Sequence, residues 1–102
     1  MNAPTPAPEY WRLEVAADLV RLPPTRIRRY MRRGLIHPSR VEGKVLLFDD
    51  SGLARLRKIR RLTEDLGLNI AGAEVALHLL DEIEALRAAM GKRQQEQATM
   101  EE

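Results

Sequence analysis

Apolar residues recur at helical spacing in two short segments near the start of the chain. Between residues 13 and 20 they lie three or four positions apart, and charged residues fall between them. Pro23 and Pro24 then remove backbone donors and end this pattern. A second helical segment follows over residues 25–33, and Gly34 after it suits the left-handed cap of a helix C-terminus. The sequence therefore predicts two short helices joined by a turn.

The pattern then changes from helical to extended. Val41 and residues 45–48 are rich in β-forming side chains, and the segment Glu42-Gly43-Lys44 between them is typical of a hairpin tip. Two helices, a turn and a following hairpin, in this order, make a winged helix–turn–helix domain. The expected fold is mainly α, with a small β-hairpin wing and a long C-terminal helix.

Helical periodicity returns over residues 51–66. Asp49 and Asp50 precede this segment as candidate N-caps, and Gly67 follows it as a stop. The apolar stripe of this third helix is expected to consist of Leu53, Leu56, Ile59 or Arg60, and Leu62 or Thr63. This stripe predicts that the third helix packs on the domain while its basic side faces outward.

A last helix is predicted over residues 70–90, with Asn69 as its N-cap. Five apolar residues alternate there in spacings of three and four, which is a heptad seam: Ala76, Leu79, Ile83, Leu86 and Met90. Such a seam predicts pairing with a second helix, either in a homodimer or on a partner protein. A second apolar stripe, expected to dock on the domain, consists of Ile70, Ala73, Leu77 and Leu80.

These elements divide the 102 residues into a single folded domain and its flanking segments. Residues 1–9 contain three prolines and are predicted to be a disordered tail. Residues 10–69 form the winged helix–turn–helix, residues 70–90 the partner or dimerisation helix, and residues 91–102 a frayed polar tail. The chain has no apolar run of the ~18 residues that a membrane span needs, and no signal peptide, so we expect a soluble, cytoplasmic protein.

Charge is strongly segregated along the chain. Seven arginines fall within residues 21–40, whereas residues 74–102 carry a net charge of −4. One surface could therefore face an anionic partner and another a cationic one, although a solvated helix face would give the same counts. The total net charge of +2 hides this segregation.

Residues suited to catalysis or metal binding are few. The chain has no cysteine, which excludes disulfides and thiolate metal sites, and only His37 and His78 remain as nitrogen ligands. His78 could share a helix face with Glu74 and Asp81, but a single histidine with two acids is more typical of an ordinary surface. We expect a protein without catalytic residues, metal or cofactor.

The segment from Leu13 to Leu86 resembles a MerR-type winged helix–turn–helix. The matching residues are Val15-Ala16, Leu19, Ile27-Arg28-Arg29-Tyr30, Gly34-Leu35-Ile36, Pro38, Arg40, Phe48, Leu56, Arg57, Ile59 and Arg60-Arg61-Leu62. The run Asp65-Leu66-Gly67-Leu68-Asn69-Ile70-Ala71-Gly72 further resembles two subfamilies. These are, first, the chaperone modulators of the CbpM type and, second, the heat-shock repressors of the HspR type.

Similarity to the CbpM type implies binding to the J-domain of a DnaJ-type co-chaperone, and control of its coupling to DnaK. J-domains as a family present a basic helix, so an acidic face could bind them by complementary charge. The candidate residues for this partner are Glu64, Asp65, Glu74, Asp81 and Glu82. Chaperone modulation is the leading prediction from the sequence.

Similarity to the HspR type implies a dimeric DNA-binding repressor of stress genes, which is the alternative prediction. It would bind DNA with the second helix and the wing, through the candidate residues Arg26, Arg28, Arg29, Arg32 and Arg40. In the MerR pattern a wing tyrosine and arginine contact the DNA backbone, at the positions of Val45 and Leu46 here. An apolar side chain cannot neutralise a phosphate, which is why this reading comes second.

Overall fold

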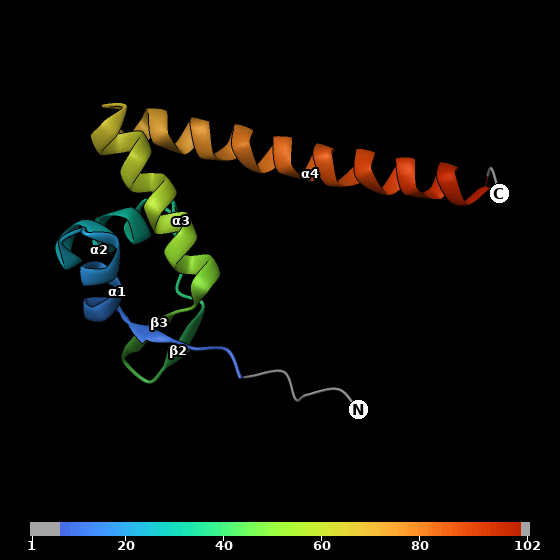
Figure 1. Cartoon of the computed structure of the whole chain (residues 1–102). Helices are drawn as coiled ribbons and strands as arrows, with labels where there is room; N and C mark the ends of the chain where they lie inside the picture. The colour runs from blue at the N-terminus through green and yellow to red at the C-terminus, as the bar shows by residue number, and fades with distance from the viewer. Residues whose placement is uncertain (1–6, 101–102) are drawn as a thin grey trace.

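The computed structural model describes residues 7–100. Its helices and strands follow one another as β1 (Trp11–Arg12), α1 (Leu13–Val20), α2 (Pro24–Arg32), β2 (Arg40–Glu42), β3 (Val45–Phe48), α3 (Asp50–Arg60), the π-helical turn η1 (Arg61–Asp65) and α4 (Ile70–Met100). Figure 1 shows a body formed by the first elements, from which the long α4 projects. The predicted winged helix–turn–helix with a hairpin wing and a long C-terminal helix is confirmed.

The first two helices follow from the local sequence. Helix α1 ends where Arg21 adopts a left-handed backbone conformation, with φ of 61°, and its N–H donates to carbonyls of the last turn. Helix α2 begins at Pro24, because proline at the first helical position loses no hydrogen bond and already has a helical φ. The bend between them closes with the Leu22 N–H donating to the Ala17 carbonyl at 3.0 Å.

The wing belongs to a three-stranded antiparallel sheet in the order β1-β3-β2. The hairpin turns at Gly43, whose φ of 61° is accessible to glycine without strain. Strand β1 was not predicted, because two residues cannot show a periodicity of two. It forms through pairing with β3, where Trp11 lies opposite Phe48.

Helix α3 begins at the capping carboxylate of Asp49. Its Oδ1 accepts the Gly52 N–H at 2.9 Å and the hydroxyls of Ser39 and Ser51, each at 2.8 Å. These donors lower the pKa of Asp49, with the Gly52 N–H having the largest effect, followed by the hydroxyls of Ser51 and Ser39. Asp49 is therefore the N-cap, and the alternative Asp50 is the first helical residue.

The predicted single helix over residues 51–66 is wrong in one respect: α-helical geometry ends at Arg60, and the wider turn η1 follows. Thr63 contributes to this change, because its hydroxyl donates to the Ile59 carbonyl at 2.9 Å and competes with regular helical bonding. Gly67, with φ of 70°, then reverses the chain toward α4.

A single apolar core connects all the helices. Its most deeply buried large side chains are Leu13, Val20, Ile27, Ile36, Phe48, Leu56, Ile59 and Leu77. The leucines and the isoleucine predicted for the apolar stripe of the third helix are all buried: Leu53, Leu56, Ile59 and Leu62. The alternatives Arg60 and Thr63 are only half-buried. Tyr30 of α2 is also buried, and its hydroxyl lies 3.3 Å from Thr63 Oγ1. This contact links α2 to η1.

Helix α4 is longer than predicted. It runs 31 residues from Ile70 to Met100, so the expected frayed tail from residue 91 is wrong for residues 91–100. Gly91 costs about 1 kcal/mol relative to alanine within a helix, but the Lys, Arg, Gln and Glu residues after it are good helix formers. The proposed disordered tail lies mostly in residues 1–6, outside the described residues, and residues 7–9 have no regular structure.

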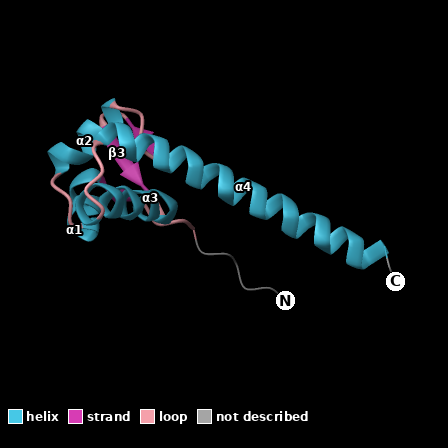
Figure 2. Cartoon of the chain, turned by 90° about the horizontal axis from the view of Figure 1, so that it is seen from above, coloured by secondary structure: helices cyan, strands magenta, loops and turns pink. Residues whose placement is uncertain are grey.

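Only the first turns of α4 pack on the body. The Asn69 side chain caps the helix by accepting the Gly72 N–H at 2.7 Å, as predicted. Ala73 and Leu77 of the docking stripe are buried, and Ile70 and Leu80 are half-buried. Figures 1 and 2 show that the rest of the helix extends away from the body.

Candidate nucleic-acid interface

Helix α2 presents a row of arginines to solvent. Its inner side is set by Ile27 and Tyr30, which are both buried in the core. Because one face is fixed in this way, Arg28, Arg29 and Arg32 must lie on the opposite, exposed side of a helix with 3.6 residues per turn. This exposed row is the most cationic helical surface of the helix–turn–helix.

Ion pairs divide the α2 arginines into two groups. Arg26 contacts Glu64 of η1, and Arg28 lies 3.4 Å from Glu14 of α1. Both pairs are largely exposed to water, where such pairs are weak, so these arginines could exchange an acid for a phosphate. Arg29 and Arg32 have no ion-pair partner within residues 7–100, so their charge is available to a ligand.

The wing and α2 border the same shallow hollow. Leu46 of β3 is half-buried against the core and lines a shallow hollow with Arg28, Met31 and Arg32. Arg40, at the base of the wing, pairs with Glu42 at 3.0 Å and lies over the Tyr10 ring, 5.8 Å from its centroid. Leu46 therefore places an apolar side chain beside the cationic residues of α2.

Two basic residues that the sequence reasoning missed lie beside Arg28. Arg12 and Lys44 line a cavity of about 200 Å³ together with Arg28, Glu14, Leu13, Val45 and Leu46. No pattern in the sequence could have indicated that these residues lie together, because the pairing of β1 with β3 brings them together. The cationic surface thus extends from α2 toward the wing tip.

The five acids expected to bind a J-domain do not form one continuous free surface. Glu64 is enclosed by Arg26 and Arg60, and Asp81 pairs with Arg55. Glu82 lies 3.2 Å from the imidazole of His78, one turn earlier on α4. Glu74 and Asp65 are exposed, with no ion-pair partner within residues 7–100. Their role toward a partner stays a prediction.

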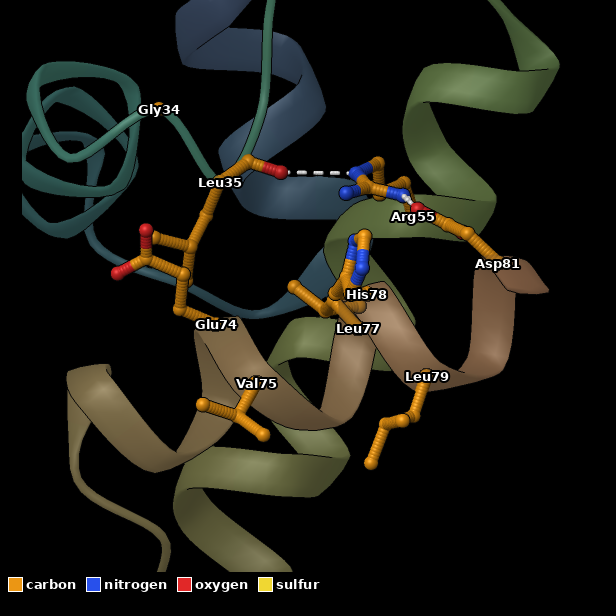
Figure 3. Close-up of a pocket in the computed structure, with 9 residues that line it drawn as sticks. All are labelled: Gly34, Leu35, Arg55, Glu74, Val75, Leu77, His78, Leu79 and Asp81. Carbon is orange, nitrogen blue, oxygen red and sulfur yellow. Dashed lines mark hydrogen bonds and ion pairs between the residues drawn. The ribbon is translucent and has the colours of Figure 1, made fainter.

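Another hollow lies between the body and the start of α4, as Figure 3 shows. It measures about 440 Å³ and is lined by Gly34, Leu35, Arg55, Glu74, Val75, Leu77, His78, Leu79 and Asp81. The Arg55 side chain spans one wall, since its Nε donates to the Leu35 carbonyl at 2.8 Å and its Nη1 faces Asp81. Although Glu74, His78 and Asp81 share this hollow, no three such ligands within residues 7–100 are placed to hold a metal ion.

The heptad seam of α4 is exposed over most of its length. Leu79, Ile83, Leu86 and Met90 have exposed fractions between 42% and 64%, while Ala76 is half-buried against the core. A row of large apolar side chains on one helix face is typical of a contact surface. Among residues 7–100, no helix is both long enough and apolar enough to cross a bilayer.

Comparison with known proteins decides the family. A model of the MerR HTH family of regulatory proteins matches residues 13–92, which include the helix–turn–helix, the wing, α3 and most of α4. This chain belongs to the MerR HTH family. Within that family it is 33% identical over 76 residues to a protein assigned as heat shock protein HspR of Streptomyces coelicolor, covering 74% of this chain and 50% of the relative. The MerR-family chain thus spans about half the length of that relative.

The fold also matches a solved structure. A transcription regulator of Ralstonia metallidurans, crystallised in complex with lead(II), superposes with a TM-score of 0.63 and 23% sequence identity. The match covers 89% of this chain and 80% of the regulator. It supports the winged helix–turn–helix architecture of this MerR-family chain.

Proposed function

We propose that this chain is a DNA-binding transcription regulator that acts as a dimer on stress genes, in the manner expected of an HspR-type repressor. The observation that carries the proposal is the exposed row of α2, with Arg29 and Arg32 free of ion pairs within residues 7–100, in a MerR-family helix–turn–helix. The similarity to an HspR protein supports the heat-shock assignment. These findings favour the alternative prediction over chaperone modulation.

In this proposal α2 enters the major groove of DNA. A recognition helix of a helix–turn–helix lies there while the preceding helix crosses the backbone. Arg28, Arg29 and Arg32 would then face base edges and phosphates, and arginine binds guanine through two parallel hydrogen bonds. Arg26 and Arg40, on the two flanks, would contact the backbone after leaving Glu64 and Glu42.

The seam of α4 supplies the dimer. Pairing of two copies through Leu79, Ile83, Leu86 and Met90 would cover the exposed apolar row and place two copies of α2 on one DNA duplex. Dimeric helix–turn–helix proteins read half-sites about 34–36 Å apart, or multiples of that spacing. A palindromic or near-palindromic operator is the expected ligand.

Selection from a random DNA pool at physiological salt tests the proposal. We expect one motif to be enriched, and Arg29→Ala to weaken binding to that motif by about 5- to 150-fold, since one base contact contributes about 1–3 kcal/mol. Arg57→Ala is the matched control, because Arg57 is an exposed arginine on α3. Failure of the folded parent to enrich any motif would overturn the proposal.

J-domain binding is a second proposal with narrower support. The bend between α3 and α4 exposes Leu66, with an exposed fraction of 69%, next to the exposed Asp65. An apolar group beside an acid suits a basic amphipathic helix.

A further inference from the structure

Three cationic residues from separate parts of the fold line one cavity. Arg12 is the last residue of β1, Arg28 lies in the middle of α2, and Lys44 lies at the tip of the wing. All three line the cavity of about 200 Å³, whose apolar side is formed by Leu13, Val45 and Leu46. The site is therefore built by the tertiary fold and by no local sequence motif.

Strand pairing explains why these residues converge. Arg12 lies opposite Leu47 on β3, which returns from the wing turn that carries Lys44. Helix α1 begins directly after Arg12, so its first turn, with Leu13 and Glu14, forms another wall of the cavity.

The charges of this cavity are unbalanced. Its lining has three cations against the single carboxylate of Glu14, which lies 3.4 Å from Arg28. The Glu14 side chain is 65% exposed and that of Arg28 50% exposed, so water weakens their attraction and the pair can open. Cations held close together repel one another, and a bound anion would relieve that repulsion.

The start of α1 adds to the positive potential. Arg12 stands at the N-cap position, and its side chain makes no capping hydrogen bond to the first turn. Arg12 therefore supplies no acceptor to the backbone N–H groups of that turn, and a helix N-terminus favours anions. This feature supports the side-chain cluster and does not carry the site by itself.

We propose that Arg12, Arg28 and Lys44 form a seat for one phosphate of the DNA backbone. The proposal rests on the DNA-binding function proposed above and assigns a further contact to it. The seat adds positive charge beside the apolar wing residues Val45 and Leu46, which line the same cavity. When a phosphate enters, Arg28 turns from Glu14 to the phosphate oxygens.

The test compares the salt dependence of DNA binding in matched double variants. Arg12→Gln with Lys44→Gln removes two charges from the seat, and Arg57→Gln with Arg61→Gln removes two exposed charges elsewhere. Loss of one phosphate contact should make the slope of log K against log salt shallower by about 0.9 for the seat variant only. Its affinity should fall on all sequences alike, with the selected motif unchanged. Circular dichroism melting curves confirm that both variants fold.

A third variant tests the opposite direction. Glu14→Gln removes the carboxylate that competes with the phosphate for Arg28. We expect DNA binding to tighten a few-fold, and the slope of log K against log salt to steepen or stay unchanged. Equal slopes for the parent and the Arg12/Lys44 variant, or equal changes in both double variants, would overturn the seat while the DNA-binding function stands. A folded parent that binds no DNA would overturn both.

Discussion

Arg55 on α3 and Asp81 on α4 form one of the two ionic contacts that join the body to the projecting helix within residues 7–100. Arg55 Nη1 lies 3.3 Å from each carboxylate oxygen of Asp81, while Arg55 Nε donates to the Leu35 carbonyl at 2.8 Å. One guanidinium group therefore links α4, α3 and the loop that follows α2. With the buried side chains of Ala73 and Leu77, it sets the direction in which α4 leaves the body.

We predict that Asp81→Asn widens the range of angles at which α4 leaves the body, with little loss of folding stability. The two side chains are 33% and 47% exposed, so the pair should contribute about 0.2–1 kcal/mol. Spin labels on the body and near the end of α4 would measure the change, as a broader distance distribution than in the parent. Glu96→Gln, far along α4, is the control, and an equal broadening there would contradict the prediction.

Asp49 should make stability depend on pH in the acid range. Its pKa is lowered in the folded state by the Gly52 N–H first and then by the hydroxyls of Ser51 and Ser39. A lowered folded-state pKa contributes stability above the unfolded-state pKa, about 3.9, and that stability is lost as pH falls through the folded-state value.

Urea denaturation of the parent and Asp49→Ala measures this effect. At neutral pH the variant should lose about 0.5–2 kcal/mol, the usual cost of losing an N-cap. The difference between the two proteins should begin to shrink below about pH 4, where the carboxyl of the unfolded chain takes up a proton, and should be lost as pH falls through the lower folded-state pKa. A difference that stays constant down to pH 2.5 would show that Asp49 acts without its charge.

The seam of α4 should control self-association. We predict that Ile83→Glu lowers the mass measured by sedimentation from dimer to monomer, because a carboxylate would have to be buried in an apolar helix contact. Ala88→Glu is the matched control, since Ala88 lies on the opposite side of the same exposed helix. Dissociation by both variants alike would indicate that general charge, and not the seam, weakens the dimer.

The J-domain prediction has its own measurement. If the acidic bend between α3 and α4 binds a basic helix, Asp65→Lys should slow association with an isolated J-domain severalfold while folding is unchanged. Association of the parent should also slow as salt rises, because the screening length falls to ~8–10 Å near physiological salt. Glu96→Lys reverses an exposed charge far from the bend as a control. Absence of binding by the folded parent at tens of micromolar would end this proposal.

The helices and their caps were predictable because the signals are local. Pro23 and Pro24 delimit α1 and α2, and Asn69 caps α4 three residues before the amide that it accepts. Strand β1 was not predictable, because its two residues are recognised only through pairing with Phe48 and Leu47, far along the chain.

The candidate site was likewise predictable only where its signals are local in the sequence. The arginines of α2 could be placed on one face from the apolar positions Ile27 and Tyr30 alone. The contact of Arg26 with Glu64 joins residues 38 positions apart, so no spacing rule indicates that part of the acidic segment is already paired. Lys44 beside Arg28 likewise depends on how the wing folds over α2.

The length of α4 makes it a lever. At 1.5 Å per residue its 31 residues span about 46 Å, so a tilt of about 10° where it leaves the body displaces its far end by roughly 8 Å. In a dimer paired through these helices, small adjustments at the Arg55–Asp81 contact would be magnified into changes in the distance between the two bodies. The range of spacer lengths between half-sites that such a dimer accepts would then depend on that contact, which lies well away from the DNA bases.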